Sequence, residues 1–166
     1  NINFSGLVED KNKEELEEVN SLNVIKDSAV NVESASNITI DSCEFYNVNS
    51  SAIAIKDYTY NTKVQNNKIN NIGCSGILIG VKNNTVDDQR NLTDDFNNVY
   101  TLKTGDDGIN RIPCKINVTD NWINDIGKVE NMSVGIGVQS ANSVNLNNNT
   151  IENIQYVGVL TRGGSD

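Results

Sequence analysis

One pattern of residue spacing recurs four times along this chain. Each copy begins with an apolar residue, has asparagine or cysteine three positions later, and has apolar residues again five and eight positions after the first. The copies begin at Ile40, Val64, Val118 and Leu146. The first two begin 24 residues apart and the last two 28 apart, an interval typical of a solenoid unit built from short strands and turns.

A further apolar segment follows each copy, at residues 52–56, 76–80, 135–139 and 158–162. Side chains alternate between the two faces of a strand, so the second and fourth residues of each segment, such as Ile53 and Ile55, are expected to stack inward. A unit of this size cannot bury its apolar face alone and must stack on neighbouring units about 4.8 Å away. The repeat therefore predicts an all-β parallel β-helix, a solenoid of roughly four rungs.

The second and third copies begin 54 residues apart, which predicts an inserted loop at 81–113 within a single domain, 1–166. A β-helix has to cover its first and last rungs, because open strand edges recruit other strands. Only residues 163–166 follow the last repeat. We therefore expect the chain to be one part of a longer β-helix that another polypeptide segment completes.

Asparagine occupies 30 positions, and stacked rungs explain this composition. Asn67, Asn121 and Asn149 can form a ladder of side-chain amides, each bonded to the rungs above and below. Cys43 takes the same position in the first copy and is expected to be a buried thiol. Turns accept asparagine because it tolerates the left-handed backbone conformation. The asparagines that we assign to turns are Asn66, Asn70, Asn71, Asn147, Asn148 and Asn153.

The remaining positions of the third segment are expected to face outward. They are Ala52, Gly76, Gly135 and Gly158, then Ala54, Leu78, Gly137 and Leu160, then Lys56, Gly80, Gln139 and Arg162. Small residues dominate, which predicts a shallow floor bordered by polar groups, on which an extended sugar polymer could lie. Tight stacking of rungs would favour the same small residues, so both interpretations stand.

Composition excludes several classes of function. A net charge of −9 without a basic cluster argues against nucleic-acid and anionic-membrane partners. No apolar run is long enough to cross a membrane. The chain has no histidine, which excludes within it serine–histidine and cysteine–histidine catalysis and histidine-ligated zinc. We expect Cys43, Cys74 and Cys114 to be free thiols, with a disulfide between Cys74 and Cys114 as the alternative.

The inserted loop holds three pairs of aspartates, namely Asp87 and Asp88, Asp94 and Asp95, and Asp106 and Asp107. Hydrolysis of a glycosidic bond uses two carboxyl groups, about 5.5 Å apart for retention and farther apart for inversion. Rungs about 4.8 Å apart could bring a loop aspartate close to one from an adjacent rung. Gly105 and Gly108 permit a turn that lets Asp106 and Asp107 face one substrate. A solvated acidic loop and a calcium site are the alternatives.

Six further residues are candidates for substrate binding. Arg90, Tyr100 and Arg111 lie in the inserted loop, and Lys56, Gln139 and Arg162 lie at the end of the predicted floor. A mixture of charged and aromatic side chains is typical of a binding loop rather than of a simple connector.

Four runs of sequence, at 37–45, 76–80, 121–127 and 133–138, carry a resemblance to a known superfamily. They resemble the right-handed parallel β-helix repeats of secreted bacterial carbohydrate-active enzymes, and the resemblance covers residues 24–163. Within that superfamily the chain looks most like the β-helix glycosidases of glycoside hydrolase family 136, which include lacto-N-biosidases. Related sequences commonly continue the last rung with a Gly-Trp-Gly-Trp element, where this chain has Thr161 followed by arginine and two glycines.

The resemblance implies a bacterial protein, secreted or at the cell surface, that hydrolyses glycosides with retention, uses two aspartates and needs no metal cofactor. Some of these enzymes are assembled from separate chains. Related sequences carry aspartates and an arginine in the loop before the third copy, which Asp106, Asp107 and Arg111 match. The resemblance thus favours Asp106 and Asp107 as the catalytic carboxylates, and Asp88 and Asp95 from the other acidic pairs of the loop are held in reserve.

Three functions stay open on the sequence alone. The first is a glycoside hydrolase that acts on an oligosaccharide or polysaccharide. The second is a calcium-dependent polysaccharide lyase, in which carboxylates hold the metal and Lys56, Arg90, Arg111 or Arg162 removes a proton. The third is a non-catalytic segment that binds glycans or serves as an adhesin.

Overall fold

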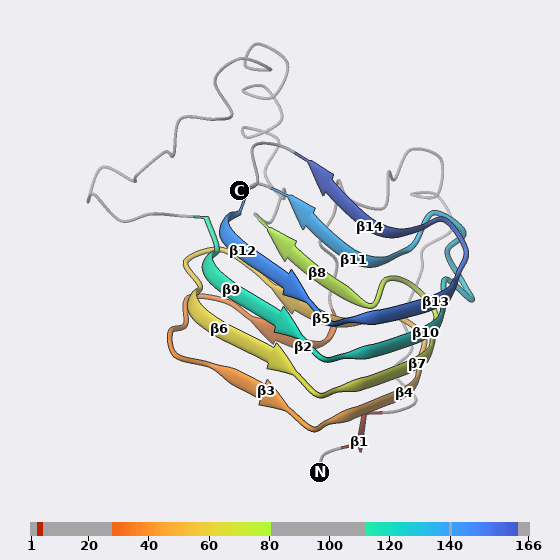
Figure 1. Cartoon of the computed structure of the whole chain (residues 1–166). Coiled ribbons are helices and arrows are strands. Elements are labelled where there is room, and N and C mark those ends of the chain that lie inside the picture. The colour runs from red at the N-terminus through yellow and green to blue at the C-terminus, as the bar shows by residue number, and fades with distance from the viewer. Residues whose placement is uncertain (1–2, 5–27, 81–111, 140, 163–166) are drawn as a thin grey trace.

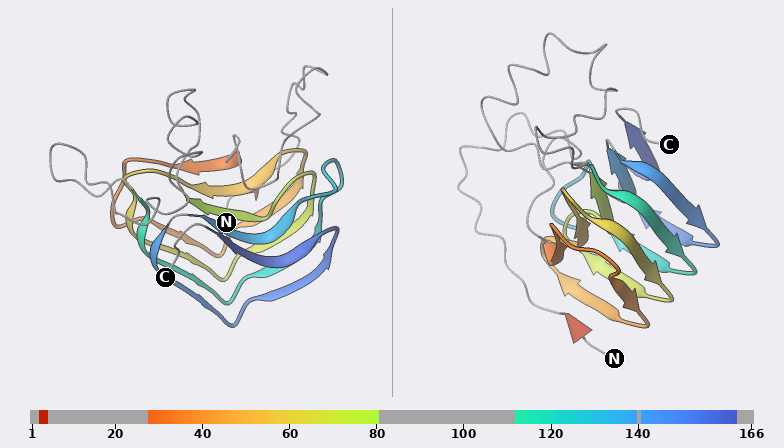
Figure 2. Two further views of the ribbon diagram at one scale, coloured as in Figure 1. Left: turned by 90° about the horizontal axis from the view of Figure 1, so that it is seen from above. Right: turned by 90° about the vertical axis from the view of Figure 1, so that its left-hand side faces the viewer.

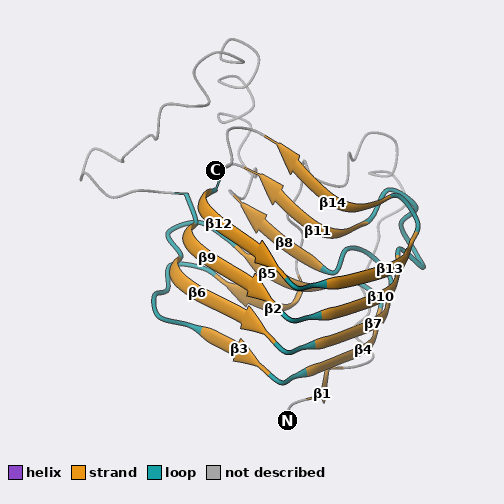
Figure 3. Cartoon of the chain, in the orientation of Figure 1, coloured by secondary structure: helices purple, strands orange, loops and turns teal. Residues whose placement is uncertain are grey.

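The computed structural model describes residues 3–4, 28–80, 112–139 and 141–162, and these form three β-sheets (Figure 1). Figure 3 shows only strands, turns and loops in the described part of the chain. Every pair of neighbouring strands is parallel. Each turn of the chain adds one strand to each of the three sheets in succession, so the chain winds as the predicted parallel β-helix.

Strands of the same sheet lie above one another along the helix axis (Figure 2). Sheet A contains, in spatial order, β1 (Asn3–Phe4), β4 (Glu44–Val48), β7 (Lys68–Ile72), β10 (Trp122–Ile126) and β13 (Thr150–Ile154). Sheet B contains β2 (Ser28–Val32), β5 (Ser51–Ile55), β8 (Ile77–Gly80), β11 (Val134–Gln139) and β14 (Val157–Arg162). Sheet C contains β3 (Thr39–Asp41), β6 (Tyr60–Gln65), β9 (Cys114–Thr119) and β12 (Asn142–Asn147).

The predicted columns of apolar residues are confirmed by the strand register. The first residues of the four copies pair across sheet C, and Phe45, Ile69, Ile123 and Ile151 pair across sheet A. Across sheet B, Ile53, Ile77, Ile136 and Val159 form the equivalent column. Residues of the middle rungs such as Ile77 and Ile123 are 0% exposed, and burying one aliphatic side chain of this size contributes about 1.5–3 kcal/mol.

The predicted ladder of amides is also confirmed. The backbone N–H of Cys43 donates to Asn67 Oδ1 at 2.9 Å, that of Asn67 to Asn121 Oδ1 at 3.0 Å, and that of Asn121 to Asn149 Oδ1 at 3.1 Å. Each asparagine Nδ2 donates to a carbonyl one rung back, as Asn121 does to Val64 at 2.9 Å. The ladder therefore satisfies buried backbone groups at the corner between sheets C and A.

Left-handed backbone conformations explain many of the other asparagines. The corner between sheets C and A contains Ser42, Asn66, Asp120 and Asn148, with φ between 53° and 57°. A bend inside the strands of sheet A contains Asn47, Asn71, Asp125 and Asn153, with φ between 55° and 60°. The turn assignment is confirmed for Asn66 and Asn148. Asn71 and Asn153 adopt the left-handed conformation within strands β7 and β13, and Asn70 and Asn147 lie in strands β7 and β12.

One column that we expected to face outward faces inward. A Cβ added to Gly76 would lie 3.0 Å from Ile123 Cγ2, and one added to Gly135 would lie 2.6 Å from Ile151 Cγ2. Ala52, in the rung before, is likewise part of the central core. The prediction was wrong because the chain bends between sheets A and B, so strict alternation of side chains does not hold at that corner. The residues are small because the isoleucines of sheet A fill the space.

Two features at the N-terminal end were not predicted. β2 adds a strand to sheet B, in which Val30 and Val32 pair with Ile53 and Ile55, and β1 pairs with β4 in sheet A. The three cysteines are free, but Cys43 is half-buried rather than buried.

Candidate functional site

Most of the residues predicted to act in catalysis lie outside the part of the chain that the structure describes. This holds for the four candidate carboxylates, Asp88, Asp95, Asp106 and Asp107, and for the loop residues Arg90, Tyr100 and Arg111. The inserted segment leaves the β-helix directly after β8 and returns at Ile112, shortly before β9. Its point of departure is therefore the carboxyl end of a sheet B strand.

The three other predicted site residues lie at this same end of sheet B. Gln139 pairs in register with Gly80 on one side and with Arg162 on the other. Lys56 directly follows β5 and is 2% exposed. Gln139 Oε1 is buried and accepts no hydrogen bond from the part of the chain that the structure describes. The structure thus brings Gln139 next to Arg162, as the repeat predicted, and buries Lys56.

The outer face of sheet B is not the open floor that we expected. Ala54 is 0% exposed, Leu78 2% and Val134 0%, and these three side chains form an apolar cluster of their own, separate from the central core. Val157 and Leu160 pack against it and are partly buried. The outward-facing aliphatic residues of this sheet therefore pack against each other and do not offer an accessible surface for a sugar polymer.

The outer face of sheet A is accessible and carries two exposed aromatic residues, Tyr46 and Trp122. Its outward positions alternate with the buried column that contains Phe45 and Ile123. They form two rows across the rungs: Glu44, Lys68, Trp122 and Thr150 in one row, and Tyr46, Asn70, Asn124 and Glu152 in the other. We call these eight residues the sheet A platform. None of the eight is buried.

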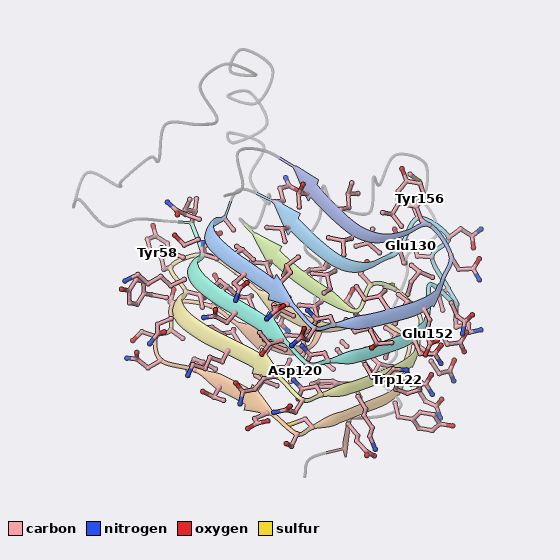
Figure 4. The ribbon with its side chains drawn as sticks, in the orientation of Figure 1. Tyr58, Asp120, Trp122, Glu130, Glu152 and Tyr156 are labelled. Carbon is pink, nitrogen blue, oxygen red and sulfur yellow. The ribbon has the colours of Figure 1, made fainter. Side chains whose placement is uncertain are left out.

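Two aromatic side chains of the platform are strongly exposed, Tyr46 at 52% and Trp122 at 36%. Trp122 is oriented by a hydrogen bond from its indole Nε1 to Glu152 Oε1 at 2.6 Å, and Figure 4 shows the two side chains together. A tryptophan N–H with a fixed partner leaves the ring faces as the remaining binding surface. The carboxylate is held beside the ring by the same contact.

Two side-chain amides, those of Asn70 and Asn124, lie between Tyr46 and Glu152 in one row of the platform. Asn124 Nδ2 donates to Asn70 Oδ1 at 2.8 Å, and Asn153 Nδ2 donates to Asn124 Oδ1 at 2.7 Å. An amide has two donor hydrogens and two acceptor lone pairs, so each member of this row keeps hydrogen-bonding capacity beyond these contacts. Lys68 Nζ lies 3.1 Å from Glu44 Oε1, which pairs two of the platform's three charges.

The platform is large enough for several small rings. Neighbouring strands are about 4.8 Å apart and alternate residues of a strand about 6.6 Å apart, so the two rows cover roughly 14 Å by 6.6 Å between backbone positions. Four strands contribute to it, β4, β7, β10 and β13. An extended ligand could therefore lie along the helix axis and contact every rung.

The platform does not provide the carboxylate pair that hydrolysis requires. Glu44 and Glu152 lie on β4 and β13, whose backbones are about 14 Å apart, whereas the carboxyl groups of glycosidases are at most about 9.5 Å apart. At the paired positions of the described strands, no two carboxylates face each other. The arrangement on sheet A is thus suited to binding rather than to cleavage.

The outer face of sheet C is more polar and its functional groups are paired with each other. Lys115 Nζ donates to the Tyr60 hydroxyl at 2.6 Å and lies 5.0 Å from the ring centroid, and this hydrogen bond raises the pKa of Lys115. Asp41 accepts hydrogen bonds from Asn66, Gln65 and Ser42, which lower the pKa of its carboxyl group. Because these contacts occupy the groups, sheet C is the weaker candidate.

The described residues offer no metal site and no membrane-spanning helix. No group of three histidine, cysteine, aspartate or glutamate side chains in these residues is placed to hold a metal ion. Their secondary structure also includes no helix with the length and apolar character needed to cross a bilayer.

The alternation of outward polar and aromatic residues could have indicated the platform from sequence. Tyr46 and Trp122 each directly adjoin an inward residue of the repeat, Phe45 and Ile123, so both were predictable as outward. Their proximity depends on β4 and β10 being two strands apart in one sheet, which the repeat also implied. The small residues of the third segment of the repeat favoured a site on that strand instead.

Comparison with known proteins identifies the fold. The family model described as a right handed beta helix region matches residues 20–166. No curated protein and no solved structure matched the chain.

Proposed function

Because the chain belongs to the right-handed β-helix family, we propose that it is a carbohydrate-active β-helix protein that binds an oligosaccharide or polysaccharide on the sheet A platform. The observation that carries this proposal is the exposed Trp122 ring, held by Glu152 beside a row of side-chain amides. Proteins of this family serve several chemistries on one fold, so the function has to be argued from the site.

The chemistry of the platform matches a sugar better than other small ligands. A pyranose ring has an apolar face of C–H groups, which packs on an exposed aromatic ring, and an edge of neighbouring hydroxyls. Those hydroxyls both donate and accept, as do the amides of Asn70 and Asn124, while Glu152 accepts. Aromatic packing with a few convergent polar groups is the usual composition of a ligand site.

The charge of the platform favours a neutral glycan. Lys68 and Glu44 neutralise each other, and Glu152 is the one further charge among the eight residues. The whole chain carries a net charge of −9, which repels polyanions such as uronate polymers. A neutral oligosaccharide would meet hydrogen-bonding groups without crossing an unfavourable potential.

Hydrolysis extends the proposal beyond the described residues. In this extension the protein is a retaining glycoside hydrolase of the lacto-N-biosidase type, exported to the medium or surface of a bacterium, with Asp106 and Asp107 as catalytic carboxylates. Sheet A then holds a part of the glycan away from the bond that is cleaved. The absence of paired carboxylates on the described strands is consistent with a catalytic pair drawn from the segment 81–113.

Binding is tested with a glycan array probed with the intact protein and with Trp122→Ala. Loss of one stacked ring is expected to weaken binding about tenfold, the equivalent of about 1.4 kcal/mol. Tyr58→Ala is the matched control, because Tyr58 is 37% exposed but lies at the corner between sheets B and C. Equal affinities for the wild type and Trp122→Ala would exclude the platform as the binding site.

Catalysis is tested separately with aryl glycosides and galacto-oligosaccharides. Asp106→Asn and Asp107→Asn are expected to abolish turnover while glycan binding by the sheet A platform is unchanged. Turnover should persist in EDTA, because two carboxylates act without a metal. Turnover that stops in EDTA and yields unsaturated, ultraviolet-absorbing products would instead identify a calcium-dependent lyase.

A further inference from the structure

The two ends of the β-helix differ in how well the core is covered. At the C-terminal end, β12, β13 and β14 are the edge strands of the three sheets (Figures 1 and 2). Core-facing side chains of this rung are partly exposed: Val159 is 44% exposed, whereas Ile136, one rung below it, is 0% exposed. Val144, Leu146, Ile151 and Ile154 are likewise only partly buried against the core.

At the N-terminal end the core-facing side chains of sheet A are covered. Phe45 and Val48 are each 1% exposed, although β4 belongs to the first complete rung. β1 pairs with β4, with Phe4 in register with Phe45, and so occupies the outer edge of sheet A. In sheet B, Val30 is partly buried at this end, whereas Val159 at the other end of the same column is 44% exposed, so the C-terminal end is the less covered of the two.

The hydrogen bonds of the amide ladder also distinguish the N-terminal from the C-terminal end of the β-helix. At each of three successive rung contacts, the backbone N–H of the ladder residue donates to Oδ1 of the next asparagine toward the C-terminal end. Asn149 is the last of these asparagines, and its Nδ2 donates backward to the Val118 carbonyl at 2.8 Å. Among the described residues, none accepts a hydrogen bond from the Asn149 backbone N–H.

We propose that the C-terminal end of the β-helix is an interaction surface for one more parallel β-rung, supplied by a polypeptide segment outside these 166 residues. The segment needs an asparagine opposite Asn149, so that the Oδ1 atom of this added asparagine accepts a hydrogen bond from the Asn149 backbone N–H. It also needs aliphatic side chains opposite Ile151 and Val159. Strand edges provide the backbone hydrogen bonds, and the exposed core provides the apolar contact.

A second copy of this chain does not fit this surface. Stacking head to tail would require β13 of one copy to pair with β4 of another, but β1 already occupies that edge of β4. Stacking tail to tail about a two-fold axis would make the paired strands antiparallel. The ladder geometry is seen here only between parallel strands, so the occupant is a rung that continues the same winding.

The test duplicates residues 140–162 directly after Arg162 in the full chain. Gln139 and Arg162 are in register. A copy of residues 140–162 placed after Arg162 therefore starts at the same point of its rung as the original segment does after Gln139. The added rung should shift the midpoint of urea unfolding upward by about 1 M, because it buries Val159, Ile151 and their neighbours. In the control, the duplicate has alanine in place of the copied Asn149 and aspartate in place of the copied Ile151.

The control duplicate should return the midpoint to that of the unextended chain. An unchanged midpoint with the intact duplicate, or an equal gain with both duplicates, would overturn the proposal. Light scattering of the unextended chain tests whether a second copy of the chain covers the C-terminal end instead. A dimer that Val159→Lys dissociates would show that a second copy covers the end, and would also overturn the proposal.

Discussion

Asn121 Oδ1 accepts two hydrogen bonds from Asn67, one from the backbone N–H at 3.0 Å and one from Nδ2 at 2.9 Å. Asn121 Nδ2 donates to the Val64 carbonyl at 2.9 Å. Both asparagines are almost completely buried, at 1% and 2% exposed. A single side chain thus satisfies groups from two different parts of the preceding rung, where water cannot replace it.

We expect Asn121→Ala to lower the free energy of unfolding by about 3 kcal/mol or more. The substitution removes the partner of the Asn67 backbone N–H, one of the two hydrogen bonds of Asn67 Nδ2 and one donor to the Val64 carbonyl, at about 1–3 kcal/mol for each buried group that is left unsatisfied. Asn145→Ala is the control, since Asn145 is exposed and its contact with Asn117 is 3.4 Å long. Urea unfolding of both variants measures the difference, and similar losses would contradict a special role for the ladder.

The inward column of small residues predicts opposite results for two glycines. An alanine Cβ at Gly76 would lie 2.5 Å from the Gly135 carbonyl oxygen and 3.0 Å from Ile123 Cγ2, so Gly76→Ala should cost about 1–3 kcal/mol. At Gly158 the nearest atom is Ile151 Cγ2 at 3.7 Å, and Gly158→Ala should be tolerated. Thermal unfolding of the two variants compares them directly. A larger loss at Gly158 would refute the inward assignment.

Thr62 places a hydroxyl inside the apolar core. It is 0% exposed, pairs in register with Ile116, and its Oγ1 has no hydrogen-bond partner among the described residues. Thr62→Val keeps the shape and removes the unpaired hydroxyl, so we expect a gain of about 1 kcal/mol in the free energy of unfolding. The reverse change two residues later, Val64→Thr, should destabilise the protein. Destabilisation by Thr62→Val would show that the hydroxyl has a partner.

Asp41 should make folding stability depend on pH in the acid range. Hydrogen bonds from Asn66, Gln65 and Ser42 favour its ionised form and lower its pKa in the folded state below the ordinary value of 3.8. The stabilisation that the ionised Asp41 carboxylate provides is therefore complete above the pKa of the unfolded state. It is lost as the pH falls through the lower pKa of the folded state. The difference in urea midpoint between wild type and Asp41→Asn should shrink below about pH 4. A difference independent of pH would exclude this effect.

The sequence predicted the rungs because each structural requirement recurs in every copy. The aliphatic columns through Ile69 and Ile123, the amide ladder and several left-handed asparagines all follow from the spacing of the repeat. Two strands were missed: β1 and β2 belong to an incomplete rung and lack the full pattern. The column at Gly76 was assigned to the wrong face because a bend in the chain, rather than strand alternation, sets its direction.

The candidate site was harder to predict than the fold. The outward position of Trp122 follows from the buried neighbour Ile123, but its contact with Glu152 depends on side-chain rotamers that a pattern of spacing does not specify. The outer face of sheet B looked open from its small residues, yet Ala54 and Leu78 are buried in a second apolar cluster. Which outer face a β-helix leaves accessible depends on segments outside the repeat.

The most direct test of the proposed function uses Trp122 as its own reporter, since it is the only tryptophan in the chain. Fluorescence of the wild-type protein is titrated with neutral oligosaccharides of increasing length. A sugar ring packed on the 36% exposed indole should shift the emission to shorter wavelength with saturation, and longer oligosaccharides that reach Tyr46 should bind more tightly. Emission that is unchanged while the glycan demonstrably binds would show that the sugar lies elsewhere and would contradict binding on sheet A.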